Sequence, residues 1–187
     1  MGAEATEAKN QSIKKGLMVL LIVLVFVLVI WAIVFKCNVN KQLHIEKNAA
    51  MSLWERFNYK LVPFERDIEH IKAGSVSELL ALIFNVVAFL VIGCLLRFVV
   101  NVKATLLIGF LFTSSVELFQ LFSAWGGFDF MDLATNMLGL VLGILSYKVI
   151  FSKLPSKVIN ALIYICLTIA VPLSIFAIVN TAINFPV

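Results

Sequence analysis

Apolar residues are grouped along the chain into five long runs, which polar segments separate. A helix that crosses the hydrocarbon core of a bilayer needs about 20 mostly apolar residues, and each run has roughly that length. The expected spans are residues 17–35, 76–98, 104–122, 131–151 and 157–179. The pattern therefore predicts an all-α integral membrane protein with five transmembrane helices, folded as a single domain over residues 1–187.

The composition agrees with this fold class. Hydrophobic residues make up 61% of the chain and charged residues 14%, whereas soluble domains have roughly 25% charged residues. The basic residues are scattered, so no cluster indicates nucleic-acid binding. Cys37, Cys94 and Cys166 lie in or beside different apolar runs without a CxxC spacing, which argues against a disulfide framework and a zinc site.

The distribution of Lys and Arg predicts the orientation in the membrane. The N-terminal tail and the turns that follow the second and fourth spans together carry eight Lys and Arg, whereas the turn at 123–130 and the C-terminal tail carry none. Short cytoplasmic segments are enriched in these residues. We therefore expect a multi-pass protein of a bacterial cell membrane, with a cytoplasmic N-terminus and an extracytoplasmic C-terminus.

The long segment 37–75, between the first two spans, lies on the extracytoplasmic side in this topology. Met51, Trp54, Phe57 and Leu61 recur in it at helical spacing. This predicts an amphipathic helix on the outer membrane surface. Packing against the outer ends of the spans is an alternative, and the two interpretations are compatible.

The last three acidic residues of the chain are Glu117, Asp129 and Asp132, within 16 positions of an otherwise apolar region. Positions three and four apart share a helix face. One polar face at the outer end of the third span holds Thr113, Ser114, Glu117 and Gln120. A second, at the start of the fourth span, holds Asp132, Thr135 and Asn136, and Gly139 and Gly143 continue it. Because a short turn joins these spans, we expect the two faces to meet.

A structural role is one interpretation of these residues. Asp129 is placed to cap the fourth span, and Asp132 to lie in its first turn near the positive helix end. Gln120 and Asn136 would then form hydrogen bonds between helices. Glu117 fits this interpretation less well, because an ionisable group inside a span costs about 2.5 kcal/mol or more and by default marks a functional site.

The carboxylates require partners, and residues 104–147 contain no Lys, Arg or His. We expect Arg66 or Lys60, in the outer segment, to fold over the acids and pair with them. A bound divalent cation is the other way to neutralise three acids, but the ligand spacing across two helices is unspecific, and no metal or cofactor is predicted.

The motif Glu117-x-x-Gln120, followed by Asp129-x-x-Asp132-x-x-x-Asn136-x-x-Gly139-x-x-x-Gly143, resembles the signature of the VanZ-like family of bacterial membrane proteins. Two further stretches are similar to family elements: Leu61-Val62-Pro63-Phe64, and Asn85-x-x-x-Phe89-x-x-x-Gly93 in the second span. The chain departs from the family at three positions. Gly126 replaces an Arg that would balance the acids, Lys60 replaces an Asn, and Val91 replaces a Pro.

The resemblance implies a link to reduced susceptibility to glycopeptide antibiotics such as teicoplanin, which bind peptidoglycan precursors outside the membrane. We therefore expect a protein that binds a lipid headgroup, a lipid-linked cell-wall intermediate or the lipid tail of a lipoglycopeptide at the outer leaflet. The expected ligand-binding residues are Glu117, Gln120, Asp129, Asp132, Asn136, Arg66 and Asn85.

Two alternatives to a binding protein remain. A membrane enzyme acting on a lipid-linked substrate would rest on the acids alone, because no nucleophile elbow, P-loop or HExxH motif is present. A structural or accessory subunit would use the acids only for helix packing. The sequence identifies no catalytic residue and does not fix the oligomeric state.

Overall fold

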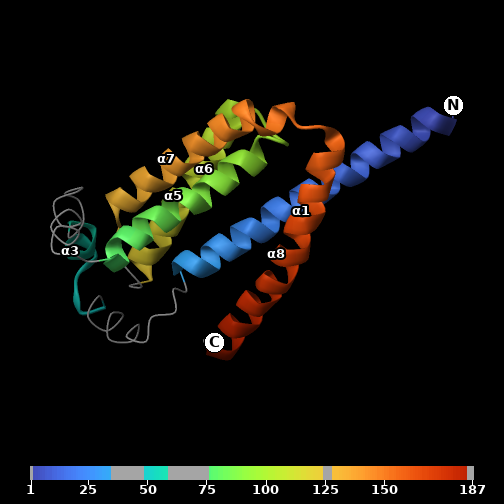
Figure 1. Ribbon diagram of the computed structural model, residues 1–187. Coiled ribbons are helices and arrows are strands. Elements are labelled where there is room, and N and C mark those ends of the chain that lie inside the picture. Colours follow the sequence, from blue (N-terminus) through green and yellow to red (C-terminus); the bar gives the residue numbers. More distant parts are fainter. Residues whose placement is uncertain (1, 35–48, 59–75, 124–127, 185–187) are drawn as a thin grey trace.

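The computed structural model describes residues 2–34, 49–58, 76–123 and 128–184 of the chain. In this part, five long helices follow one another (Figure 1): α1 Gly2–Val34, α5 Val76–Leu96, α6 Val102–Phe122, α7 Phe130–Val149 and α8 Ser156–Asn184. Two shorter elements are the helix α3, Leu53–Asn58, and the 3-10 helix η1, Phe151–Lys153. The predicted all-α fold is confirmed.

Each long helix contains a stretch that is long and apolar enough to cross a membrane, and the predicted spans correspond to them one to one. The largest difference is in α1, which begins at Gly2, whereas its candidate span covers only Gln11–Ala32. The residues that precede the apolar run include Ala, Glu, Lys and Gln, all of which favour helix. The helix therefore continues into the polar tail, where hydropathy alone places no element.

The helices form two groups that pack together. Figure 1 shows α5, α6 and α7 side by side, with α1 and α8 along one flank, and contacts join α5 to α7, α6 to α7 and α1 to α8. The core of the first group includes Phe89, Ile92 and Leu140, and Val29 of α1 extends it. A second core, between α1 and α8, includes Leu21 and Ile163.

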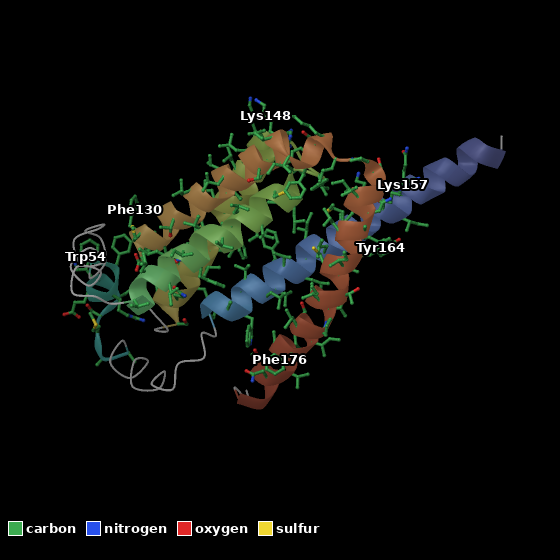
Figure 2. The ribbon with its side chains drawn as sticks, viewed as in Figure 1. Trp54, Phe130, Lys148, Lys157, Tyr164 and Phe176 are labelled. Atoms are coloured by element: carbon green, nitrogen blue, oxygen red, sulfur yellow. The ribbon has the colours of Figure 1, made fainter. Side chains whose placement is uncertain are left out.

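The outer surface of the bundle is apolar. Only 17–33% of the residues in the candidate spans are buried inside the structure, and many large apolar side chains are exposed, among them Tyr164 on α8, which Figure 2 labels. Such a surface is stable in lipid, where apolar side chains need no protein partner. The chain is a multi-pass membrane protein.

Glycines bring α5 and α7 into close contact. A Cβ atom added at Gly139 would overlap the backbone carbonyl of Val86, and one added at Gly143 would overlap that of Leu90. Gly93 of α5 lies equally close to the backbone of Leu140. The sequence placed Gly139 and Gly143 on the face directed at the third span, and this is wrong, because they face α5. On a helix with 3.6 residues per turn, the polar stripe of α7 is broad enough for α5 to cover one edge and α6 the other.

Candidate functional site

Polar side chains, five of them buried and Asp132 half-buried, gather at one end of the α5–α6–α7 group. One comes from α5, two from α6 and three from the start of α7, so that three different helices contribute to one cluster. We call this set the polar cluster: Asn85, Thr113, Glu117, Asp129, Asp132 and Asn136.

Asp129 caps α7, as the structural interpretation of the sequence predicted. Its backbone is extended, and its Oδ1 accepts hydrogen bonds from the backbone N–H groups of Met131 at 2.9 Å and Asp132 at 3.4 Å. A carboxylate at this position satisfies N–H groups that have no partner inside the helix and favours the positive helix end. Asp129 therefore fixes where α7 starts.

Glu117 is almost fully buried, with 1% of its surface exposed. Its Oε2 accepts a hydrogen bond from the backbone N–H of Asp129 at 2.9 Å. This contact ties the outer end of α6 to the start of α7, so the predicted meeting of the third and fourth spans is observed. A carboxylate within a span is costly, and the bond to Asp129 gives Glu117 a polar partner there.

Asp132 and Asn136 point in different directions from α7. Asp132 Oδ1 accepts a hydrogen bond from Asn85 Nδ2 of α5 at 2.7 Å, so Asp132 is directed at α5 and not at α6. Asn136 Nδ2 donates to Thr113 Oγ1 of α6 at 2.8 Å. The start of α7 is thus joined to both neighbouring helices through side chains.

The two amides of the cluster each retain an acceptor. Asn85 and Asn136 are exposed by 1% and 2%, and among the described residues the Oδ1 atom of each has no hydrogen-bond partner. A buried polar atom without a partner is destabilising by about 1–3 kcal/mol. The cluster therefore has unused capacity to accept hydrogen bonds from a bound molecule or water.

Helix α3 lies at the same end of the bundle (Figure 1) and is defined by a capping box. Glu55 Oε2 accepts from the backbone N–H of Ser52 at 2.8 Å and from its Oγ at 2.7 Å, while Glu55 N–H donates to Ser52 Oγ at 3.2 Å. The two bonds that Glu55 accepts lower its pKa, and the bond from the Ser52 hydroxyl has a larger effect than the bond from the Ser52 backbone. The reciprocal bonds are those that start helices at Ser-x-x-Glu sequences.

Two contacts join α3 to α6 and to the segment that precedes α7. Arg56 Nη1 donates to the backbone carbonyl of Leu121 on α6 at 2.8 Å, and the Phe57 ring lies 5.6 Å from that of Phe128. Trp54 is 69% exposed and stands at the edge of the bundle in Figure 2. One face of α3 therefore packs on the spans, which agrees with the second interpretation of this segment, whereas its position on the outer membrane surface stays a prediction.

Two predicted site residues, Gln120 and Arg66, stay predictions as members of the cluster. Gln120 is half-buried, and its backbone carbonyl accepts from Ser123 Oγ at 3.5 Å. Arg66, Lys60 and Gly126 lie outside the described residues. The sequence interpretation missed two participants, Thr113 as a partner of Asn136 and Arg56 as the cation that reaches α6. Thr113 lies four positions before Glu117, and this spacing places both on one face of α6, which was the sequence feature that could have indicated Thr113.

The chemistry of the cluster is that of hydrogen-bond acceptance. The cluster contains three carboxylates and two amide oxygens, and an ionised carboxylate only accepts hydrogen bonds. In the described part of the chain, no three His, Cys, Asp or Glu side chains are arranged to hold a metal ion. Ser115, close to Glu117 in sequence, is exposed and donates to the Leu111 carbonyl. The arrangement thus suits recognition of a donor-bearing molecule.

Comparison with known proteins gives one match. The family model described as VanZ/LLP1 matches residues 18–151, a range that holds the whole polar cluster and α3. Neither the curated proteins nor the solved structures contain a match.

Proposed function

Because the chain belongs to the VanZ/LLP1 family, we propose that it reduces the susceptibility of a bacterial cell to glycopeptide and lipoglycopeptide antibiotics. In this proposal it binds the polar head of a lipid, or of a lipid-linked cell-wall intermediate, at the outer leaflet. The N-terminus is cytoplasmic and the polar cluster faces outward. Binding there changes access of the antibiotic to its target at the membrane surface.

The observation that carries the proposal is a set of three carboxylates and two amides at one end of a membrane-spanning bundle, among which Glu117, Asn85 and Asn136 are almost fully buried. Ionisable residues at membrane depth are costly and are kept mainly where they act. Asn85 Oδ1 and Asn136 Oδ1 supply acceptors that the described residues leave unused. The matching ligand presents donors, such as the hydroxyl, amide or ammonium groups of a sugar–peptide or aminoalkyl headgroup.

A phosphate on the same ligand needs a cation, because carboxylates repel it. Arg56 lies at this end of the bundle and uses Nη1 on the Leu121 carbonyl, while its Nε is buried without a partner among the described residues. In our proposal Arg56 holds the phosphate, alone or together with Arg66. The donor groups of the head then enter the polar cluster.

The test compares charge-neutral substitutions with an exposed control. Glu117→Gln keeps an oxygen that can accept from Asp129 N–H but removes the charge, and Asp132→Asn does the same for the contact with Asn85. Ser115→Ala lies on the same helix, outside the cluster. The readouts are the minimal inhibitory concentration of teicoplanin in a susceptible Gram-positive host, binding of labelled lipid-linked precursor to the purified protein, and the amount of protein in the membrane.

We expect both neutral variants to be present at wild-type level but to lose protection and precursor binding, and Ser115→Ala to retain both. Wild-type precursor binding by Glu117→Gln and Asp132→Asn would overturn the proposed binding site. If the wild-type protein does not raise the minimal inhibitory concentration of teicoplanin, the link to glycopeptides is overturned.

A second candidate function, a purely structural role, is favoured by the cap at Asp129 and by the contacts that join α7 to α5 and α6. Under this alternative, Glu117→Ala and Asp132→Ala unfold in detergent, and protection falls only as far as the amount of folded protein falls. Folded variants without protection would instead support ligand binding.

A further inference from the structure

A second site lies at the opposite end of the molecule from the polar cluster. There α1, α7, η1 and α8 surround an open cavity of about 750 Å³. Its polar lining consists of Gln11, Lys14, Lys15, Tyr147, Ser152, Ser156 and Asn160. In Figure 2 Lys148 and Lys157 mark this end of the bundle, and Trp54 marks the other.

The cavity is positively charged. Lys14 and Lys15 belong to its lining, and the lining residues that the structure describes include no carboxylate. Helix α8, which has 29 residues, begins at Ser156 in the same lining, so the positive end of its dipole adds to the charge of the lysines. Arg97 reinforces it from the side, with its guanidinium 5.2 Å above the ring of Tyr147.

A smaller apolar pocket adjoins this cavity. It has a volume of about 260 Å³, and its lining is formed by α1, α5, η1 and α8. Five residues line both spaces: Met18, Phe98, Phe151, Ile159 and Ile163. Deeper in the bundle the lining is entirely apolar and includes Leu21, Leu90 and Leu162. A cationic, polar cavity therefore lies directly beside a hydrocarbon pocket.

We propose that these two spaces together bind one anionic phospholipid. Its phosphate lies between Lys14, Lys15 and the start of α8, and an acyl chain occupies the apolar pocket. Basic pockets between membrane helices on the cytoplasmic side bind anionic headgroups, and this end of the bundle is cytoplasmic in the predicted topology. The site is separate from the polar cluster and does not depend on the function proposed for it.

The test uses the purified full-length chain and two double variants of equal charge. Lys14→Gln/Lys15→Gln removes the cavity lysines, whereas Lys148→Gln/Lys153→Gln removes two exposed lysines of the same end that do not line the cavity. Binding of phosphatidylglycerol and of phosphatidylcholine is measured by native mass spectrometry. Glycerol 3-phosphate, which has the phosphate but no acyl chain, is added as a competitor.

We expect the wild type to retain phosphatidylglycerol in preference to phosphatidylcholine. A lysine near an anionic membrane surface contributes about fivefold in affinity, so the cavity variant should lose at least about tenfold in phosphatidylglycerol binding and the control about twofold or less. Glycerol 3-phosphate should not displace the lipid at equal concentration.

Three outcomes would overturn the proposal. Equal binding of the two lipids by the wild type would show that the site does not select for a net negative charge, since both lipids carry a phosphate. An equal loss in both double variants would reduce the effect to general attraction by the basic end. Full displacement by glycerol 3-phosphate would make the cavity a site for free phosphate compounds, with no role for the apolar pocket. None of these results bears on glycopeptide protection, which is measured separately.

Discussion

Asn136 illustrates how single residues hold this membrane bundle together. Its amide crosses from α7 to the hydroxyl of Thr113 on α6 over 2.8 Å, and both side chains are buried. Inside a membrane, association between helices depends on packing and on such polar contacts, because lipid supplies no hydrophobic driving force between helices. The sequence predicted Asn136 as a hydrogen-bonding residue between helices, but it did not identify Thr113 as the partner.

The first prediction concerns this pair. A double-mutant cycle of Thr113→Val and Asn136→Leu should give a coupling energy of about 0.6 kcal/mol, with an upper bound near 1.7 kcal/mol, as found for hydrogen bonds between membrane helices. The measurement is reversible unfolding in mixed detergent micelles. Additive single effects would show that the contact contributes nothing to stability.

At the scale of elements, the packing of α5 against α7 depends on residues that lack a side chain. Gly139 and Gly143 face the backbone carbonyls of Val86 and Leu90. Small residues four apart let two helices approach closely enough for backbone contact. This approach also brings Asn85 within hydrogen-bond distance of Asp132, so packing and the polar cluster are coupled.

The second prediction follows from this contact. Gly143→Ala places a Cβ against the backbone of α5, and overpacking of this kind costs about 1–3 kcal/mol. Gly16→Ala is the matched control, since nothing lies within 4 Å of its added Cβ and replacing a helical Gly by Ala stabilises by about 0.5–1 kcal/mol. Opposite changes in unfolding free energy are expected, and a neutral Gly143→Ala would mean that α5 and α7 do not pack this closely.

Helix α3 is short, so its capping box matters for its position over the cluster. Six residues are too few for a stable isolated helix, and its stability comes from the Ser52–Glu55 bonds and from the contacts of Arg56 and Phe57. Loss of the Glu55 charge should therefore loosen α3.

The third prediction is a pH dependence of α3. The folded pKa of Glu55 is below its ordinary value of 4.5, so its contribution is fully present above that value and is lost as the pH falls through the lowered pKa. A nitroxide at Leu53→Cys, in a chain without its native cysteines, should become more mobile below about pH 4.5. In Glu55→Ala, which has no side-chain acceptor for the Ser52 bonds, mobility should be high at every pH; an unchanged acid response there would assign the transition to another group.

At the scale of the whole molecule, Lys148 and Lys157 lie at one end of the bundle and the carboxylates of the polar cluster lie at the other. Lys148 and Lys157 lie at one end and Trp54 and Phe130 at the other (Figure 2), and the start of α7 places Asp129 beside the latter pair. This division agrees with an orientation in which the lysine-bearing end is cytoplasmic. The resulting topology presents the polar cluster and the basic cavity to opposite leaflets.

The fourth prediction is the orientation itself. In a chain without its native cysteines, Leu53→Cys on α3 should react with a membrane-impermeant maleimide in intact cells. Ser152→Cys on η1 should react only after the membrane is opened. The reverse pattern would place the polar cluster on the cytoplasmic side and would remove the outer-leaflet binding proposal.

The sequence by itself determined the fold class, the five spans and the acidic residues of interest. An apolar run of membrane length can be recognised from the sequence alone. Such a run must be helical, because every backbone group of a spanning segment has to form its hydrogen bonds within the helix. The N-cap at Asp129 was also predictable, since capping is a local property.

Tertiary structure alone decided the partners. Whether Asp132 meets α5 or α6 depends on how far each helix rotates about its axis, and a polar stripe wide enough for two neighbours does not fix that rotation. The contact of Arg56 with α6 and the cavity at Lys14 and Lys15 likewise join residues 65 or more positions apart. Local pattern cannot identify such partners, because they are set by the packing of whole helices.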